Sequence, residues 1–244
     1  MREETEFRPK PLVEIGGRPI LWHIIKIYSQ FGFQDFVVCL GYRGQMIKDY
    51  FLRYQAMNQD FTITPGQENS VRFHSDSNER PFTVTLTDTG LATMTGGRVR
   101  RAGKYIDGDT FLLTYGDGIA DIDIGKLVRF HEKHGKLATI SVVRPLSRFG
   151  MLDIETDGRV KRFVEKPKID TWASAGFFVF NRRVLDYLDN DDCILEQEPL
   201  ERFAREHQLV AYQHEGFFFA MDTYRESLML NQMWERGDAP WKVW

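Results

Sequence analysis

The sequence is poor in cysteine and has no long apolar run. Only 2 of its 244 residues are cysteines, Cys39 and Cys193, and they lie far apart in the chain. Two isolated cysteines make neither a disulfide framework nor a zinc-type pair. No apolar run approaches the roughly 18 residues of a membrane span, and the acidic start Met1-Arg2-Glu3-Glu4 is unlike a signal peptide. We therefore expect a cytoplasmic protein with reduced thiols and no membrane partner.

The sequence also lacks a dominant charge and a histidine cluster. Its 32 basic and 35 acidic residues are well mixed and leave a net charge of −3, so we expect no nucleic-acid partner. Of the 6 histidines, only His131 and His134 have a spacing that a metal pair uses. Lys133 and Lys136 surround that pair, and their positive charge disfavours a bound cation.

A short apolar strand that ends in an acidic turn is the most informative stretch. Phe111-Leu112-Leu113 is typical of a strand buried in a parallel sheet, and Gly116-Asp117-Gly118 follows it. Ligands of open α/β sheets bind just beyond the carboxyl ends of strands, where we expect Asp117. A carboxylate there suits Mg²⁺, which takes a few carboxylates with phosphate oxygens and water. An ordinary strand-to-helix turn is the equally open alternative.

Apolar runs of strand length alternate with segments of helical periodicity along most of the chain. Expected helices span 20–31, 44–57, 98–106, 124–134, 185–188, 199–207 and 224–236, and expected strands span 36–40, 82–87, 111–113, 137–143, 172–180, 209–213 and 217–220. This alternation predicts an α/β fold with a mainly parallel sheet and helices on both faces. We also expect a hairpin insertion at 58–81 and a hairpin at 148–165 around Asp157-Gly158. No linker splits the chain, which predicts one domain over 1–244.

Acids and cations gather at the expected strand ends. They are Lys10, Arg98, Asp117, Lys166 and Asp222. This inventory suits phosphoryl or nucleotidyl transfer, where positioning, a metal and positive charge supply most of the catalysis. The small residues from Thr93 to Gly97 precede a helix, whose first N–H groups can bind an anion or a base edge. A solvated basic face is the simpler interpretation of Arg98, Arg100 and Arg101.

Several short motifs carry a family resemblance. They are the stretch 10–24 (Lys-Pro-Leu-Val-Glu-Ile-Gly-Gly-Arg-Pro-Ile-Leu-Trp-His-Ile), Asp88-Thr89-Gly90, 94–98, 114–118, 148–150, 165–167, 221–223 and the tail 237–242. Through them the sequence resembles the sugar-1-phosphate nucleotidylyltransferases, and within them those that act on glucose 1-phosphate with CTP. The resemblance implies a Rossmann-like, three-layer fold with a mixed, mainly parallel sheet. It also implies that CTP and α-D-glucose 1-phosphate give CDP-glucose and pyrophosphate, a step toward deoxysugars of bacterial surface polysaccharide.

The resemblance also implies roles for single residues. Asp117 and Asp222 match the Mg²⁺ carboxylates, and Lys10 matches a lysine that contacts phosphates, so Lys10 and Asp117 are the expected catalytic residues. The expected nucleotide contacts are Thr93, Arg98 and Gly116. In the sugar-phosphate part, 148–180, the expected contacts are Gly150, Glu165, Lys166 and Ser174.

Departures from the family pattern leave alternatives open. The family's first strand and its Gly-Gly-x-Gly-Thr-Arg loop have no counterpart here, which motivates a non-catalytic nucleotide- or sugar-phosphate-binding protein. Ala173-Ser174-Ala175-Gly176 replaces Ile-Asn-Gly-Gly, which motivates another acceptor sugar or nucleotide. Asp121-Ile122-Asp123 has the spacing of metal-dependent glycosyltransferases, although these acids also suit a helix cap. The apolar stretches 217–219 and 241–244 suggest a homo-oligomer contact.

Overall fold

A computed structural model describes residues 7–66, 70–74, 80–147 and 149–244. Its helices are α2 (Ile20–Gln30), α3 (Gly44–Leu52), α4 (Tyr54–Asn58), α5 (Thr95–Ala102), α6 (Ile124–His134), α7 (Glu198–Arg205) and α8 (Tyr224–Arg236), with 3-10 turns η1 (Lys10–Leu12), η2 (Gly103–Tyr105) and η3 (Arg182–Tyr187). Its strands are β1 (Glu14–Ile15), β2 (Arg18–Pro19), β3 (Asp35–Leu40), β4 (Asp60–Ile63), β5 (Val71–His74), β6 (Thr83–Asp88), β7 (Thr110–Thr114), β8 (Gly118–Ala120), β9 (Ala138–Val143), β10 (Met151–Ile154), β11 (Val160–Val164), β12 (Ala173–Asn181), β13 (Leu209–Gln213) and β14 (Phe218–Ala220). The predicted α/β fold is confirmed.

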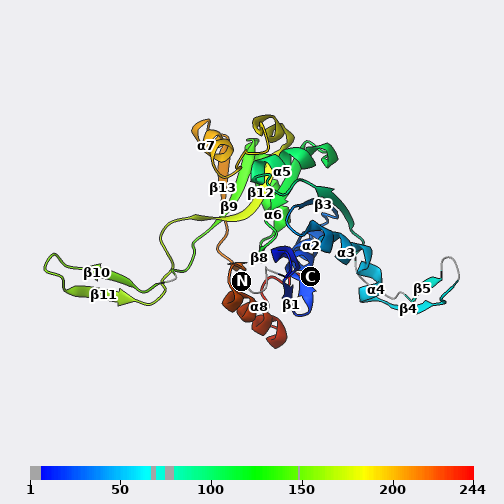
Figure 1. The fold of residues 1–244 in the computed structure, drawn as a ribbon. Coiled ribbons are helices and arrows are strands. Elements are labelled where there is room, and N and C mark those ends of the chain that lie inside the picture. The colour runs from blue at the N-terminus through cyan, green and yellow to red at the C-terminus, as the bar shows by residue number, and fades with distance from the viewer. Residues whose placement is uncertain (1–6, 67–69, 75–79, 148) are drawn as a thin grey trace.

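The sheets form the centre of a body from which two hairpins project (Figure 1). The largest sheet has four strands in the order β13-β9-β12-β7. Strands β13 and β9 run parallel, and β12 runs antiparallel to both its neighbours. Strands β3 and β6 form a separate parallel pair. The sheet is mixed, as expected, but two of the three ladders in its four-stranded part are antiparallel. Within the described residues no ladder joins β3 or β6 to β7.

Two antiparallel hairpins extend in opposite directions from the body (Figure 1). Strands β4 and β5 pair within the expected 58–81 insertion, and β10 pairs with β11 across the Asp157-Gly158 turn. Gly158 has φ +88°, which suits a glycine in this tight turn. Both predicted hairpins are confirmed, and we call β10–β11 the long arm.

Helix α2 is the most deeply buried helix near the start of the chain. Ile20, Ile24 and Ile27 recur at helical spacing, and each side chain is at most 3% exposed. Their core also contains Phe177 of β12 and Leu230 of α8. The predicted helix therefore forms because its apolar stripe packs against both the central sheet and the C-terminal helix.

An aromatic cluster behind α2 overturns the expected subunit contact at 241–244. Trp241 is fully buried inside the chain, where its ring stacks on Phe217 with centroids 5.6 Å apart. The Trp241 indole N–H donates to Nδ1 of buried His23 over 3.3 Å, and His23 Nε2 lies 2.9 Å from the Ile15 carbonyl oxygen. The tail is apolar because it completes the core of its own subunit.

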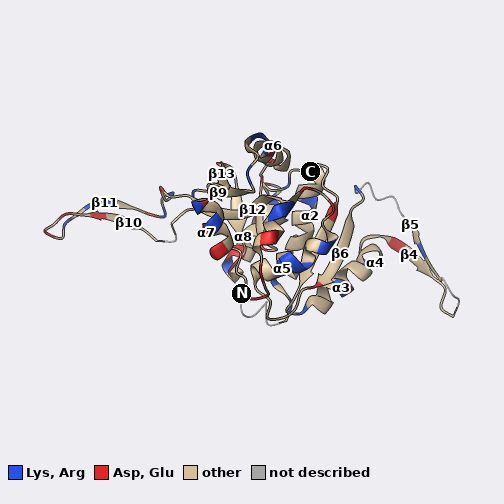
Figure 2. Ribbon diagram, turned by 90° about the horizontal axis from the view of Figure 1, so that it is seen from above, with Lys and Arg blue, Asp and Glu red and all other residues tan. Residues whose placement is uncertain are grey.

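The charged residues are spread over the molecule, and its helices are short. Figure 2 shows basic and acidic residues interspersed along the ribbon of the body and of both hairpins. Helix α8, with 13 residues, is the longest among the described residues. None of the helices in the described ranges combines the length and apolar character needed to cross a bilayer.

Candidate active site

A short ladder brings the two predicted metal carboxylates together. Strand β8, just after Asp117, pairs antiparallel with β14, just before Asp222, so that Gly118 lies opposite Ala220. The backbone N–H of Met221 also donates to the Asp117 carbonyl over 2.9 Å. Two acids from distant parts of the sequence therefore emerge side by side at the end of the same two-stranded ladder.

Lys10 completes this cluster. Its ammonium donates to Oδ2 of Asp117 over 2.7 Å and to Oδ1 of Asp222 over 2.6 Å. Burial alone would lower the pKa of Lys10, but the hydrogen bonds and charges of the two carboxylates outweigh burial and raise that pKa. Lys10 is therefore charged at neutral pH, and the carboxylates share one counterion. We call Lys10, Asp117 and Asp222 the charged triad.

The loop before α2 is fixed against the acidic turn. This loop forms a 3-10 turn at Lys10, in which Leu12 N–H donates to the Pro9 carbonyl over 2.8 Å. A Cβ on Gly116 would lie only 2.9 Å from Cγ of Pro11, so only glycine lets the two segments approach this closely. Gly116, an expected nucleotide contact, thus has a packing role that the sequence did not reveal.

Helix α8 is fixed at the same place. Thr223 caps it, and Glu226 accepts from the backbone N–H groups of Asp222 and Thr223, each over 2.7 Å. The Asn231 side chain accepts from Gly16 N–H over 2.9 Å and donates to the Glu14 carbonyl over 3.1 Å. The helix that follows Asp222 therefore holds the segment that follows Lys10.

The two carboxylates of the charged triad suit a divalent cation. Two carboxylates with space for phosphate oxygens and water are the ligand set that Mg²⁺ usually takes. Their side chains are 30% and 48% exposed, so solvent ions can reach them. Within the described residues, no group of three or more His, Cys, Asp or Glu side chains gathers for a metal. Remaining ligands would therefore come from a bound phosphate and from water.

The start of α5 differs from its expected role. The sequence predicted free N–H groups there, but Met94 N–H donates to the Asp191 carbonyl over 2.8 Å and Gly96 N–H to the Cys193 carbonyl over 2.9 Å. A Cβ on Gly97 would lie 2.7 Å from Cα of Asp191. The glycines admit the loop 190–196, and carbonyls of that loop occupy the expected anion site.

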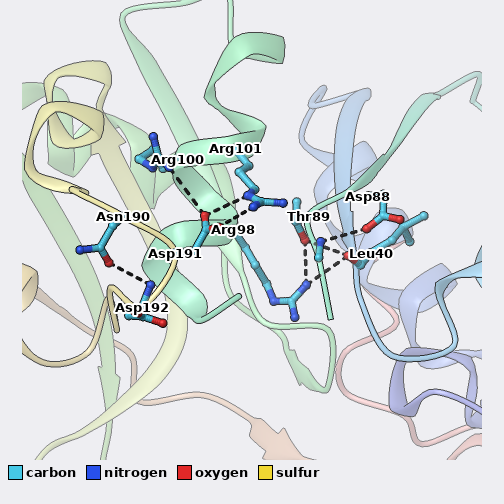
Figure 3. A network of polar contacts seen from close by, with 10 residues as sticks. Leu40, Asp88, Thr89, Arg98, Arg100, Arg101, Asn190, Asp191 and Asp192 are labelled. Carbon is cyan, nitrogen blue, oxygen red and sulfur yellow. Dashed lines mark hydrogen bonds and ion pairs between the residues drawn. The ribbon is translucent and has the colours of Figure 1, made fainter. Parts of the chain in front are cut away.

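Arg98 and its basic neighbours are engaged in internal contacts (Figure 3). The Arg98 guanidinium donates to Thr89 Oγ1 over 2.7 Å and to the carbonyls of Leu40 and Leu91 over 3.1 and 3.3 Å. Arg101 forms a two-pronged ion pair with Asp191, and Arg100 approaches the same carboxylate at 3.6 Å. The expected solvated basic face is wrong for Arg98, which holds α5 to neighbouring strand ends. Arg100 and Arg101 stay exposed, at 44% and 42%, while they pair with the loop.

Thr93 lies among these contacts. Its side chain is only 7% exposed. A Cβ on Gly90, which has φ +91°, would lie 2.6 Å from Thr93 Oγ1. Of the expected nucleotide contacts, Thr93 and Arg98 therefore lie together at the ends of β3 and β6, and Gly116 lies in the Asp117 turn.

Sequence reasoning missed a network around Glu196. The Tyr115 hydroxyl donates to Glu196 Oε1, and Thr95 Oγ1 donates to Oε2 over 2.6 Å. Burial, followed by the Glu196 hydrogen bond and charge, raises the pKa of Tyr115, so the phenol stays protonated as a donor. Glu196 connects the Asp117 turn to the first residue of α5. Only its place in an acidic loop marked it in the sequence, which was too weak a signal.

The expected sugar-phosphate residues lie in two places. Glu165 and Lys166 follow β11 at the base of the long arm, where their charged groups lie 3.6 Å apart and are exposed. A Cβ on Gly150 would lie 3.1 Å from Glu165 Oε2, so these residues are neighbours. Figure 1 shows the long arm leading away from β8 and α8. The structure does not join these three residues to the charged triad.

Ser174 lies closer to the acidic turn. Its Oγ accepts from Gly176 N–H over 3.2 Å. Gly176 has φ +73°, and a Cβ there would meet the Tyr115 ring at 2.5 Å. Ser174 therefore lies two residues before Gly176, whose backbone packs against the Tyr115 ring. Tyr115 directly precedes Gly116 and Asp117.

The two acids with glycosyltransferase spacing and the histidine pair have structural partners. Asp123 caps α6 by accepting from Lys126 N–H over 2.8 Å, and Asp121 accepts from Phe217 N–H over 2.7 Å. His131 and His134 both contact Thr139 Oγ1, at 2.8 and 2.7 Å. These contacts favour a structural role for both sequence patterns.

Sequence comparison identifies relatives over the whole chain. A family model described as nucleotidyl transferase matches residues 4–215. Glucose-1-phosphate cytidylyltransferase of Salmonella typhi is 49% identical over 246 residues, which cover 100% of this chain and 95% of that relative. Mannose-1-phosphate guanyltransferase of Saccharomyces cerevisiae is 28% identical over 89% of this chain and 56% of its own length.

Comparison with solved structures supports the Rossmann-like α/β fold. HddC from Yersinia pseudotuberculosis, solved as a complex with GMP-PN, matches with a TM-score of 0.62 and 21% identity, over 93% of this chain and 90% of that chain. Apo-UDP-glucose pyrophosphorylase matches with a TM-score of 0.65 and 14% identity, over 97% of this chain and 94% of that chain. At these identities the likeness concerns the Rossmann-like α/β fold alone.

Proposed function

The chain belongs to the nucleotidyl transferase family, and we propose that it transfers the cytidylyl group of CTP to α-D-glucose 1-phosphate, with release of pyrophosphate. The glucose-1-phosphate cytidylyltransferase that is 49% identical over the whole chain supports this substrate pair. The observation that carries the chemistry is the bridge from the Lys10 ammonium to Asp117 and Asp222, at 2.7 and 2.6 Å. It gathers one cation and two carboxylates, which are the groups that would bind a triphosphate and its metal.

Each residue of the charged triad has a separate role in the proposed reaction. An oxygen of the sugar phosphate attacks the α-phosphorus of CTP, and the bond from that phosphorus to the β-phosphate oxygen breaks. The attacking group is already an anion, so no general base is required. Lys10 contacts phosphate oxygens and stabilises the charge that develops on them. Asp117 and Asp222 would hold Mg²⁺, which when bound would neutralise phosphate charge and orient the triphosphate.

Substrate recognition extends beyond the charged triad. On the nucleotide side the proposal includes Thr93, Arg98 and Gly116, with Arg98 acting through the strand ends that it holds. Glu165 and Lys166 would bind the sugar phosphate, since a carboxylate accepts from sugar hydroxyls and an ammonium pairs with phosphate. Gly150 and Ser174 belong to the same 148–180 part of one domain spanning 1–244. Ser174 lacks the amide of asparagine, so a different acceptor sugar is the main variant of this proposal.

The long arm supports a homo-oligomer. Leu152 and Ile154 share one face of the hairpin with their partners Phe163 and Val160. These four side chains are 47–66% exposed. A second copy of the chain would cover this apolar face, which replaces the expected contact at the C-terminal tail. The proposed setting is the cytoplasm, where CDP-glucose would feed surface-polysaccharide synthesis such as that of O-antigen.

A substrate screen tests the proposal. Purified protein with Mg²⁺ and glucose 1-phosphate is given each common nucleoside triphosphate, and products are separated by anion-exchange chromatography. We expect CDP-glucose and equimolar pyrophosphate, with kcat/KM for CTP at least about tenfold above that for UTP, since one misplaced buried hydrogen-bonding edge costs about 1–3 kcal/mol. Preference for another triphosphate or sugar phosphate would change the substrate, while tight binding without turnover would support a binding protein.

A further inference from the structure

The ammonium of Lys10 occupies the position between the two carboxylates that a metal ion would need. Its Nζ lies 2.7 Å from Asp117 Oδ2 and 2.6 Å from Asp222 Oδ1. Mg²⁺ binds carboxylate oxygens at about 2.0–2.1 Å, so it would approach the same two oxygens more closely. Ammonium and metal cannot both lie between this pair. Entry of the metal therefore requires that Lys10 leave.

The backbone around Lys10 limits that movement to its side chain. Pro9 and Pro11 flank it, the 3-10 turn closes with Val13 N–H donating to the Lys10 carbonyl over 3.0 Å, and Pro11 packs against Gly116. The lysine stem has four flexible bonds, so its ammonium can swing while its backbone stays fixed. The Lys10 side chain is 28% exposed, which leaves it an open direction in which to move.

We propose that Lys10 is an internal counterion that holds the metal site closed to free Mg²⁺ until a nucleotide arrives. Resting on the proposed function, this inference concerns the order of binding. Without ligands, Lys10 cancels one of two neighbouring negative charges and keeps the carboxylates at binding distance. A triphosphate offers Lys10 a new anionic partner just as its metal replaces the ammonium. Metal and nucleotide binding are therefore coupled, because each makes the other more favourable.

Binding of Mn²⁺ alone, followed by the electron paramagnetic resonance signal of the free ion, tests this exchange without any turnover. Lys10→Met keeps a long apolar stem but removes the competing charge. We expect it to bind Mn²⁺ at least about tenfold more tightly than the original protein, with no nucleotide present. Lys10→Arg, which keeps a cation, should bind as weakly as the original. Asp222→Asn in the Lys10→Met background should remove the tight site.

A thermal scan gives a second readout. Without metal, Lys10→Met leaves the two carboxylates with no shared counterion, so the Tm of this variant should be lower than that of the original protein. Added Mn²⁺ should raise the Tm of Lys10→Met by more than it raises the Tm of the original protein. Equal Mn²⁺ affinity in the original protein and in Lys10→Met would overturn the counterion inference. If the original protein still turned over CTP, the proposed function would stand without the counterion inference. Absence of Mn²⁺ binding in every variant would overturn the metal assignment and the inference together.

Discussion

Asp117 and Asp222 carry equal formal charges but differ in their supports. Asp117 lies in a turn between two strands, while Asp222 precedes the capping box of α8. Replacing either acid by asparagine keeps its shape and removes one negative charge. Both changes should therefore affect chemistry more than folding.

We expect Asp117→Asn and Asp222→Asn each to lower kcat/KM for nucleotidyl transfer by about a hundredfold or more, because metal charge stabilisation is worth several kcal/mol. Steady-state pyrophosphate release measures the rate, and circular dichroism checks the fold. The matched control is Asp123→Asn, which still caps α6 and should keep its rate. Near-normal rates for both site variants at saturating Mg²⁺ would contradict the assignment.

His23 makes stability depend on pH. Burial lowers its pKa to about 4 from an ordinary value of 6.5. The unfolded chain therefore binds more protons than the folded one below pH 6.5, and stability present above that pH is lost as pH falls toward 4. The loss is about 3 kcal/mol, at about 1.4 kcal/mol for each pH unit.

Urea unfolding at pH 7, 6, 5 and 4.5 measures this loss. His23→Gln offers a donor toward Ile15 and an acceptor for Trp241 without titrating, so its stability should fall less steeply across that range. His131, whose pKa burial also lowers to about 4, keeps its own contribution in both proteins. Parallel curves for the two proteins would show that His23 is not the titrating group.

At the scale of elements, the contact between α5 and the loop 190–196 depends on two glycines. A methyl group at Gly97 would lie 2.7 Å from Asp191 Cα and 2.8 Å from its carbonyl oxygen. Backbone atoms cannot turn aside as a flexible side chain can. The helix and the loop must then separate, which would also strain the Glu196 bridge to Tyr115.

Gly97→Ala should therefore destabilise the protein by about 1–3 kcal/mol, as overpacking does, despite the better helix propensity of alanine. It should also raise KM for the nucleotide, since α5 carries Arg98. The control Gly125→Ala lies in the first turn of α6, where a new Cβ would meet only side-chain atoms at 3.3 Å and beyond. Denaturation midpoints and nucleotide KM values, compared for the two variants, decide the matter. A Gly97→Ala protein as stable as Gly125→Ala would refute this packing account.

Sequence patterns predicted most elements because each has a strong local signal. Helix α6 shows this well: Ile124 and Leu127 recur on one face, and Gly135 at φ +63° ends it. The expected helix 44–57 was less accurate, since Arg53, at φ −97° and ψ 3°, divides it into α3 and α4. Periodicity does not detect one residue that leaves the helical range.

The start of α5 was misinterpreted for a different reason. Small residues before a helix predict a ligand or a close neighbour equally well. The neighbour, loop 190–196, lies about a hundred residues further along the chain, so no local pattern could reveal it. The sequence put Lys10, Asp117 and Asp222 among the charged residues at strand ends, and the family resemblance gave them roles. The β8–β14 ladder supplies the geometry that no spacing rule contains.

At the scale of the whole molecule, the proposed homo-oligomer would form through the long arm. Its apolar face would remain in water in an isolated subunit. Ile154→Glu together with Phe163→Glu should therefore shift the protein toward monomers, seen as a lower mass in light scattering after size exclusion. The body should keep its Tm within a few degrees, because the arm projects away from it (Figure 1). The control Lys161→Glu changes charge on the same arm without removing apolar area, and an unchanged mass in the double variant would contradict the arm interface.

The contact between Lys10 and Asp222 spans 212 positions of the chain. During synthesis at about 5–20 residues per second, the lysine waits about 10–40 s on the ribosome before its second acid is made. A nascent chain that already contains Asp117 therefore still lacks half of the carboxylate pair. A polypeptide abandoned part-way through translation would carry the lysine and the acidic turn but no working centre. Under the proposed function, incomplete chains would neither consume triphosphate nor hold its metal, whatever fraction of their fold they had reached.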